Sequence, residues 1–294
     1  MIDAPVWRGY SQTELDRQYN SRGTVSDPGI YLREYTARTL AAKAALACHQ
    51  SVAYGEGANE RLDIYPTAQA KALVMVFMHG GDWRALSKND SGFAAPAFVA
   101  SGVTFVALDF TLVPAATLLG MGAQVRLALL WLAKNVAAFG GDPARIHIAG
   151  HSSGANLAGQ CLMTDWAKDF GVDADLIKSA VMISGLGDLE PVRLSSRNQA
   201  LHLTPAVVAQ ASLFRQTPRT ACPLLVAVGA KETEDYLRQS RELAAHWRAQ
   251  GNKARLMELP DRHHFNAVLE WADPAGEFFR ASRAMLKIQI EKPT

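Results

Sequence analysis

Cysteine is scarce in this sequence, and uninterrupted apolar runs are short. The three cysteines among 294 residues, Cys48, Cys161 and Cys222, are odd in number and widely spaced, which fits neither a disulfide framework nor a metal site. No apolar run exceeds the seven residues of Ala72–Met78, whereas a membrane-spanning helix needs about 20. P-loop, HExxH and CxxC motifs are all missing. We therefore expect reduced, buried cysteines and a protein with no metal, no cofactor and no membrane partner.

An excess of charge of one sign is missing as well. Lys and Arg number 30 against 28 for Asp and Glu, and no basic block is interleaved with aromatic residues. This balance argues against a nucleic-acid partner. The first ten residues, MIDAPVWRGY, lack the basic region and apolar core of a signal peptide, so a cytoplasmic location is expected. A small-molecule substrate is the expected partner, and a homodimer stays open.

The order of apolar segments predicts an α/β fold in a single domain, residues 1–294. Residues 1–50 form a helical arm without a strand, with one helix after a capping box at 11–14 and a second over 31–50. From residue 51 strand and helix patterns alternate, which favours a mainly parallel sheet covered by helices on both faces. Strands are expected at 61–66, 72–78, 103–109, 146–149, 180–184, 224–228 and 254–259, and helices at 90–101, 122–139, 203–214, 234–250 and 275–288.

One connection is longer than such a sheet requires. About 40 residues separate the strands at 180–184 and 224–228, whereas a parallel crossover needs only about a dozen. We interpret residues 187–220 as a cap insertion over the carboxyl ends of the strands, because substrate clefts of open α/β sheets lie at that edge.

A nucleophilic serine is predicted where the strand at 146–149 meets the following helix. The sequence there is Gly150-His151-Ser152-Ser153-Gly154, a Gly-x-Ser-x-Gly motif between a strand and a helix. The turn is so tight that it strains the serine backbone and admits only small residues two positions away. Ser152 is therefore expected to present its hydroxyl above the sheet, next to the free N–H groups of the helix N-terminus.

A serine nucleophile of this kind needs a base and an acid, in the chain order Ser, acid, His. The loop after the strand at 254–259 contains His263 and His264, and we prefer His264 because Phe265 beside it can anchor the loop. The loop after the strand at 224–228 contains Glu232 and Asp235. Glu232 is preferred, because Asp235 is explained by the helix that begins there, whose dipole favours a carboxylate.

Backbone donors for an oxyanion are expected in two places. One is the amide of Ser153, directly after the nucleophile. The other is the loop at 79–83, His-Gly-Gly-Asp-Trp, where paired glycines let N–H groups turn inward. Trp83 in this loop and Phe265 beside the base are expected to form aromatic walls of the substrate site.

Together these segments resemble the α/β-hydrolase superfamily, and within it the hormone-sensitive-lipase-like esterases. The HGGxW form, the arm at 10–19 and Glu232 ahead of residues 238–240 are more similar to the kynurenine formamidase (arylformamidase) branch. The segments that carry the resemblance are HGGDW at 79–83, DFTLVP at 109–114, FGGDP at 139–143, GHSSGANLAG at 150–159 and HHFN at 263–266.

The resemblance implies an α/β-hydrolase fold, a triad of Ser152, Glu232 and His264, and oxyanion donors at Gly81, Asp82 and Ser153. Two positions depart from the pattern: Ala115 stands where the esterases usually have an acidic residue, and Asp82 where the branch often has an aromatic one.

The implied function is cofactor-free hydrolysis of a small aryl formamide or short-acyl ester through an acyl-enzyme. N-formylkynurenine is the most specific substrate that the resemblance implies. A broad-specificity short-chain carboxylesterase with the same machinery is the first alternative. A non-catalytic binding protein of the same fold is the second.

Overall fold

A computed structural model describes residues 4–286, and its centre is a mainly parallel sheet of eight strands. Their order across the sheet is β1-β2-β4-β3-β5-β6-β7-β8. The pairs β1–β2 and β2–β4 are antiparallel, and every other neighbouring pair is parallel. The strands are β1 His49–Ala53, β2 Arg61–Tyr65, β3 Ala72–Met78, β4 Val103–Leu108, β5 Gly141–His151, β6 Ile177–Ile183, β7 Leu224–Gly229 and β8 Ala254–Leu259.

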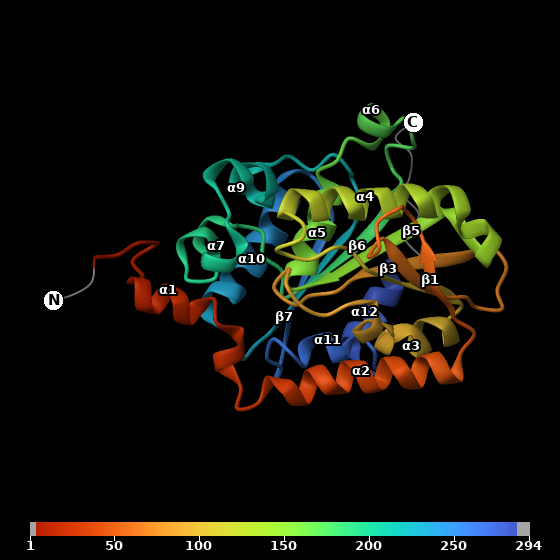
Figure 1. Cartoon of the computed structure of the whole chain (residues 1–294), viewed down its shortest axis with the longest axis horizontal. Coiled ribbons are helices and arrows are strands. Elements are labelled where there is room, and N and C mark those ends of the chain that lie inside the picture. The colour runs from red at the N-terminus through yellow and green to blue at the C-terminus, as the bar shows by residue number, and fades with distance from the viewer. Residues whose placement is uncertain (1–3, 287–294) are drawn as a thin grey trace.

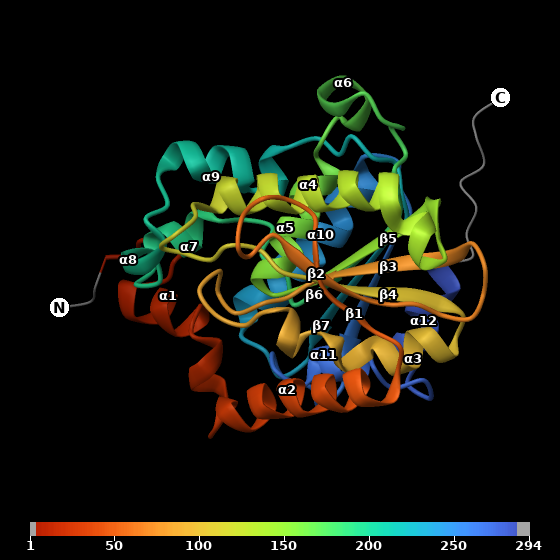
Figure 2. The same cartoon turned by 45° about the vertical axis from the view of Figure 1, so that its right-hand side comes forward.

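Helices cover both faces of this sheet (Figures 1 and 2). One face packs against α4 Leu118–Asn135, α5 Ser153–Leu162 and α10 Glu234–Ala249, which bury the larger apolar cluster. The opposite face packs against α2 Pro28–Ala45, α3 Ala95–Ala100, α11 Ala267–Glu270 and α12 Glu277–Met285. The predicted α/β-hydrolase architecture is therefore present. The central strands are apolar throughout because side chains of both faces are buried.

The arm is more varied than the sequence indicates. Its first helix, α1 Gln12–Gln18, begins at the expected N-cap, Ser11. The helix predicted over 31–50 is α2, which starts at Pro28 and ends at Ala45. The expectation that residues 1–50 contain no strand is wrong, since β1 begins at His49 and pairs with β2. HQSVA is exposed along most of its length, so it carries no apolar alternation that could have predicted it.

Other predicted helix boundaries differ from the observed ones by smaller amounts. The helix expected over 90–101 is regular only in α3, which follows two short 3₁₀ turns, Lys88–Asp90 and Gly92–Ala94. Residues 287 and 288 of the helix predicted over 275–288 lie outside the described residues. No helix in the described range, 4–286, combines the length and the hydropathy needed to cross a membrane.

The insertion and the beginning of the arm lie together beside the carboxyl ends of the parallel strands, on the left of Figure 1. Residues 187–220 form three short helices, α7 Glu190–Leu194, α8 Asn198–Leu201 and α9 Pro205–Ala211. α1 is bonded to this insertion, since Asp16 Oδ1 accepts the amide of Ser196 at 2.6 Å. The helix α6 Trp166–Phe170, which precedes the insertion in the chain, lies away from this region. The insertion and the arm thus lie together at the carboxyl ends of the parallel strands.

Candidate active site

The turn that carries Ser152 has the strained geometry that the motif predicts. Ser152 joins β5 to α5 with φ +54° and ψ −121°, a region that residues other than glycine rarely adopt. A β-carbon on Gly150 would lie 2.3 Å from the carbonyl oxygen of Gly154, and one on Gly154 would lie 2.3 Å from that of His79. Both glycines are therefore required by close packing, and the serine hydroxyl is held at the end of the strand.

The hydroxyl of Ser152 begins a chain of contacts between residues of three separate loops. Ser152 Oγ lies 2.9 Å from His264 Nε2, and His264 Nδ1 lies 2.7 Å from Glu232 Oε2. A carboxylate can only accept, so the proton of the imidazole resides on Nδ1 and leaves Nε2 free to accept the serine proton. All three side chains are buried. The structure thus brings together the serine, acid and base that the sequence nominated.

Glu232 is itself held by groups from two neighbouring strands. Its Oε1 accepts the hydroxyl of Ser184 at 2.5 Å and the amide of Gly229 at 2.8 Å. Ser184 follows β6 with φ +51°. These two bonds satisfy the carboxylate oxygen that faces away from His264, so the orientation of the acid is fixed on both sides.

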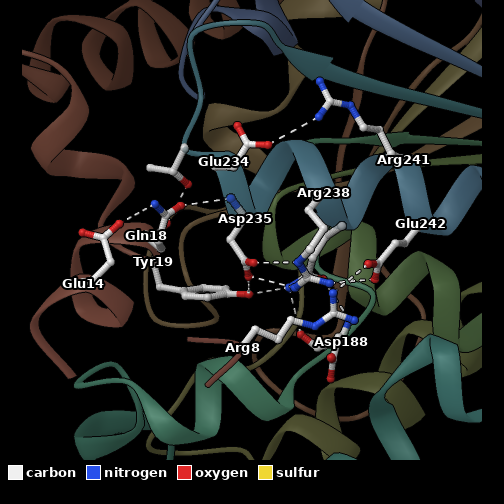
Figure 3. A network of polar contacts seen from close by, with 12 residues as sticks. Arg8, Glu14, Gln18, Tyr19, Asp188, Glu234, Asp235, Arg238, Arg241 and Glu242 are labelled. Atoms are coloured by element: carbon white, nitrogen blue, oxygen red, sulfur yellow. Dashed lines mark hydrogen bonds and ion pairs between the residues drawn. The ribbon is translucent and has the colours of Figure 1, made fainter. Parts of the chain in front are cut away.

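Asp235 is fully occupied elsewhere, in a polar network between the arm and α10 (Figure 3). Its carboxylate accepts the hydroxyl of Tyr19 and two guanidinium bonds from Arg238, at 2.7 and 2.9 Å. Its amide donates to Gln18 Oε1 at 2.9 Å. The carboxylate that competed with Glu232 therefore anchors α1, and no contact joins it to His264.

The other histidines near the site have separate surroundings. His263 is partly exposed and lies edge-on to Tyr31, with ring centres 4.6 Å apart. His151 is buried, and its Nε2 lies 2.9 Å from the carbonyl oxygen of His264. Burial lowers the pKa of His151 to about 3. A neutral His151 ring then donates to that carbonyl, which helps to hold the loop of the base.

The loop after β3 has the open backbone expected of an oxyanion loop. Gly81, Asp82 and Trp83 have φ of +103°, +60° and +57°. Gly81 and Asp82 line the cavity that contains Ser152. The amide of Trp83 is used differently, since it donates to Ser153 Oγ at 3.2 Å. His79 Nδ1 lies 2.8 Å from the carbonyl oxygen of Gly80, and its ring stacks on Phe110, so it organises the start of the loop.

A cavity of about 710 Å³ opens beside Ser152. Its wall is built from the arm, the oxyanion loop, the loop of His264 and the insertion. Phe265 lies on this wall, as the sequence predicts. The expectation for Trp83 is wrong: its side chain is 1% exposed, belongs to the main core and lies outside the cavity wall. Its position in the loop suggested a wall, but the ring packs in the main apolar cluster.

Several contributors were not predicted. Tyr19 and Tyr35 come to the cavity from the arm, Arg197 comes from the insertion, and Tyr236 of α10 lies edge-on to His264 with ring centres 4.9 Å apart. Each lies far in sequence from Ser152 and outside the motifs that predicted the triad and the oxyanion loop. Among the described residues, no group of three or more His, Cys, Asp or Glu side chains is arranged to hold a metal ion.

Comparison with solved structures identifies the fold. A structure from Silicibacter sp. TM1040 superposes with a TM-score of 0.81 at 24% identity, and covers 94% of this chain and 99% of its own. A hyperthermophilic esterase from Pyrobaculum calidifontis superposes with a TM-score of 0.70 at 19% identity, and covers 97% of each chain. The fold is that of the α/β-hydrolases.

Sequence relatives narrow this class to a family. The BD-FAE family model matches residues 62–184. A kynurenine formamidase of Salmo salar is 30% identical over 284 residues, which span 91% of this chain and 94% of the relative. A kynurenine formamidase of Danio rerio is 28% identical, spanning 96% of this chain and 98% of the relative. The chain is therefore a serine hydrolase of the esterase and formamidase type. It belongs to the kynurenine formamidase family.

Proposed function

We propose that this chain hydrolyses a small aryl formamide and that Ser152, His264 and Glu232 are its catalytic triad. N-formylkynurenine is the specific substrate that we propose. The observation that carries the proposal is the continuous chain of contacts from Ser152 Oγ through His264 to Glu232 at the wall of the cavity. Such a chain activates a serine hydroxyl for attack on an acyl carbon.

The reaction has two halves. Ser152 Oγ attacks the formyl carbon while its proton passes to His264 Nε2, and the oxyanion is bound by amides of Gly81, Asp82 and Ser153. The intermediate collapses, the C–N bond breaks, and His264 returns the proton to the leaving arylamine. Water then attacks the formyl-enzyme with His264 as base, which releases formate and restores Ser152.

The charges of the cavity support a substrate that carries a carboxylate. Two acidic residues, Asp16 and Asp82, line the cavity together with a larger set of basic ones: Arg17, Arg22, Arg84 and Arg197. N-formylkynurenine carries a carboxylate and an ammonium group away from the scissile bond. Among the described residues Arg17 pairs with Glu14, and Arg84 and Arg197 pair with Asp82, so Arg22 is the guanidinium left for that carboxylate. A simple ester makes no use of this arginine.

A broad short-chain carboxylesterase is the second candidate, because the same triad serves both reactions and about 710 Å³ is ample for many esters. Side-by-side turnover of N-formylkynurenine and 4-nitrophenyl acetate separates the two. We expect both to be cleaved, with a higher kcat/KM for the formamide. Cleavage of the ester with no turnover of any aryl formamide leaves the carboxylesterase.

The test of the nucleophile is Ser152→Ala. This variant should fold normally, since within the described residues 4–286 the hydroxyl bonds only to His264, and it should lose more than about 1,000-fold in kcat. Circular dichroism and thermal unfolding provide the folding control. A variant that kept a tenth of the wild-type rate would exclude Ser152 as the nucleophile.

The proposal includes a cytoplasmic location. All three cysteines are unpaired, with Cys161 and Cys222 buried and Cys48 partly buried. Unpaired cysteines are typical of a reducing compartment.

A further inference from the structure

The oxyanion loop contains two residues other than glycine, Asp82 and Trp83, whose positive φ depends on contacts with the rest of the protein. Glycine adopts a positive φ freely, whereas Trp83 is strained there and aspartate adopts this region only uncommonly, so contacts have to hold both residues in place. Trp83 is fixed by burial and by its bond to Ser153. Asp82 faces the cavity and needs an anchor of its own.

That anchor is Arg197, which comes from the insertion. Its Nε donates to Asp82 Oδ1 at 2.8 Å, and its Nη2 contacts the same oxygen. Its Nη1 donates to Tyr236 Oη at 3.1 Å, and its guanidinium carbon lies 5.9 Å from the centre of the Trp83 ring. One side chain thus joins the insertion, the oxyanion loop and the tyrosine that packs against His264.

A second arginine on Asp82 cannot replace this one. Arg84 donates to Asp82 Oδ2 at 2.7 Å, but 45% of its side chain is exposed, against 14% for Arg197. Exposed ion pairs contribute little because water screens them, whereas removing one partner of a sheltered pair leaves an uncompensated charge. The ion pair with Arg197 is therefore the stronger of the two ion pairs that Asp82 forms with arginine.

The charge of Asp82 makes this pairing matter for the reaction. Its amide is a proposed oxyanion donor, while its carboxylate is an anion on the same residue. An unpaired carboxylate there would repel the charge that develops on the substrate oxygen. The guanidinium of Arg197 cancels that repulsion and holds the carboxylate on the insertion side of the loop.

We propose that Arg197 is a positioning residue of this hydrolase, which acts through Asp82 to keep the oxyanion loop in its donor conformation and to neutralise the carboxylate beside it. The inference rests on the proposed function, because it needs an oxyanion that forms at Ser152. Arg197 itself touches neither the nucleophile nor the base.

Two kinetic measurements on Arg197→Met test this role. The first is kcat and KM for 4-nitrophenyl acetate. The second is the rate constant for labelling by a fluorophosphonate, in which Ser152 Oγ bonds to phosphorus, fluoride leaves and the serine proton passes to His264. We expect kcat and the labelling rate to fall about 10- to 100-fold, with KM changed less than about threefold.

The decisive variant is the double substitution Asp82→Asn/Arg197→Met. Asparagine tolerates a positive φ and has no charge to neutralise, so the double variant should label at least about fivefold faster than Arg197→Met. The matched control is Arg193→Met, which removes the same groups from the same insertion, where Arg193 pairs with Glu190. It should keep the wild-type rates.

Arg197→Lys covers the case in which Arg197→Met folds poorly, since it keeps the charge and should recover part of kcat. Three results overturn the inference: Arg197→Met within threefold of wild type, a higher KM with kcat intact, or a double variant as slow as Arg197→Met. Wild-type labelling that depends on Ser152, together with any of these, refutes the inference alone. Labelling and hydrolysis that persist in Ser152→Ala refute the proposed function and the inference with it.

Discussion

At the scale of single residues, two adjacent histidines in the loop after β8 face different surroundings. His264 is buried between Ser152 and Glu232, while His263 is partly exposed against Tyr31. We expect His264→Ala to lower kcat by about 1,000-fold or more, because the base is lost. His263→Ala should stay within about tenfold of wild type. A steady-state assay of both variants checks the assignment, and the opposite ranking would exchange the two histidines.

His147 on β5 gives a pH prediction that concerns stability alone. Its ring is 2% exposed and Nδ1 lies 2.7 Å from Ser179 Oγ. Burial, together with the charges of Arg145 and Lys178, lowers its pKa to about 3, whereas an unfolded histidine titrates near about 6.5. At a pH between these two pKa values, the imidazole of His147 is protonated in the unfolded chain and neutral in the folded chain. The contribution of His147 to stability is therefore complete above pH ~6.5 and is lost as pH falls toward 3.

Urea unfolding at pH 6.5 and pH 5.0 measures this difference. Wild type should lose about 1.5 kcal/mol more over this interval than His147→Asn, whose amide can still bond to Ser179 without titrating. His151, which keeps a lowered pKa in both proteins, cancels in the comparison. Equal losses in the two proteins would show that His147 is accessible to protons in the folded state.

At the scale of secondary-structure elements, the important contact is between α1 and α10 (Figure 3). Tyr19 donates to Asp235 and accepts the amide of Gln239 at 2.6 Å, and Thr233 Oγ1 donates to the carbonyl of Gln18 at 2.7 Å. Thr233 directly follows Glu232. The arm thus braces the segment that carries the acid and also lines the cavity.

Tyr19→Phe removes the buried hydroxyl from this contact. Burial and the charge of Asp235 raise the pKa of Tyr19 well above its usual value, so the hydroxyl remains a donor at neutral pH. Asp235 keeps its bonds to Arg238 and Gln239 keeps its bond to the carbonyl of Asp188, so the loss of the two tyrosine bonds should lower the free energy of unfolding by about 1 kcal/mol. Denaturant unfolding checks this value. Tyr10→Phe is the matched control in the same arm, because no hydrogen bond of its hydroxyl is present in the described structure, and it should change little.

At the scale of the whole molecule, the cavity exists only because the sheet, the arm and the insertion meet. Its lining contains six charged side chains beside apolar ones such as Leu32, Leu86 and Phe265. A long acyl chain would have to lie against arginine and aspartate groups and desolvate them. We predict that kcat/KM for 4-nitrophenyl esters falls about tenfold or more from acetate through butyrate to octanoate. Rates that rise toward octanoate would contradict a small-acyl site.

Local constraints explain what could be predicted from the sequence. The elbow at Ser152 depends on glycines two positions away, because a β-carbon on either would lie 2.3 Å from a backbone oxygen. The buried strands are continuous apolar runs because both faces of the sheet are covered. A histidine loop after the last strand and an acid loop after the preceding one follow from chain order alone. These features need no knowledge of distant contacts.

Tertiary structure decided whatever depends on residues far apart in the chain. Glu232 and Asp235 lie three positions apart, yet one faces His264 and the other faces Tyr19 of the arm. Trp83 turns into the core instead of the cavity, and Arg197 reaches Asp82 across 115 positions. Side chains in loops have no periodicity, so their directions are set by packing and by charges that other segments bring to them. The sequence by itself determined the chemistry that is present and its order along the chain, whereas folding determined which groups meet.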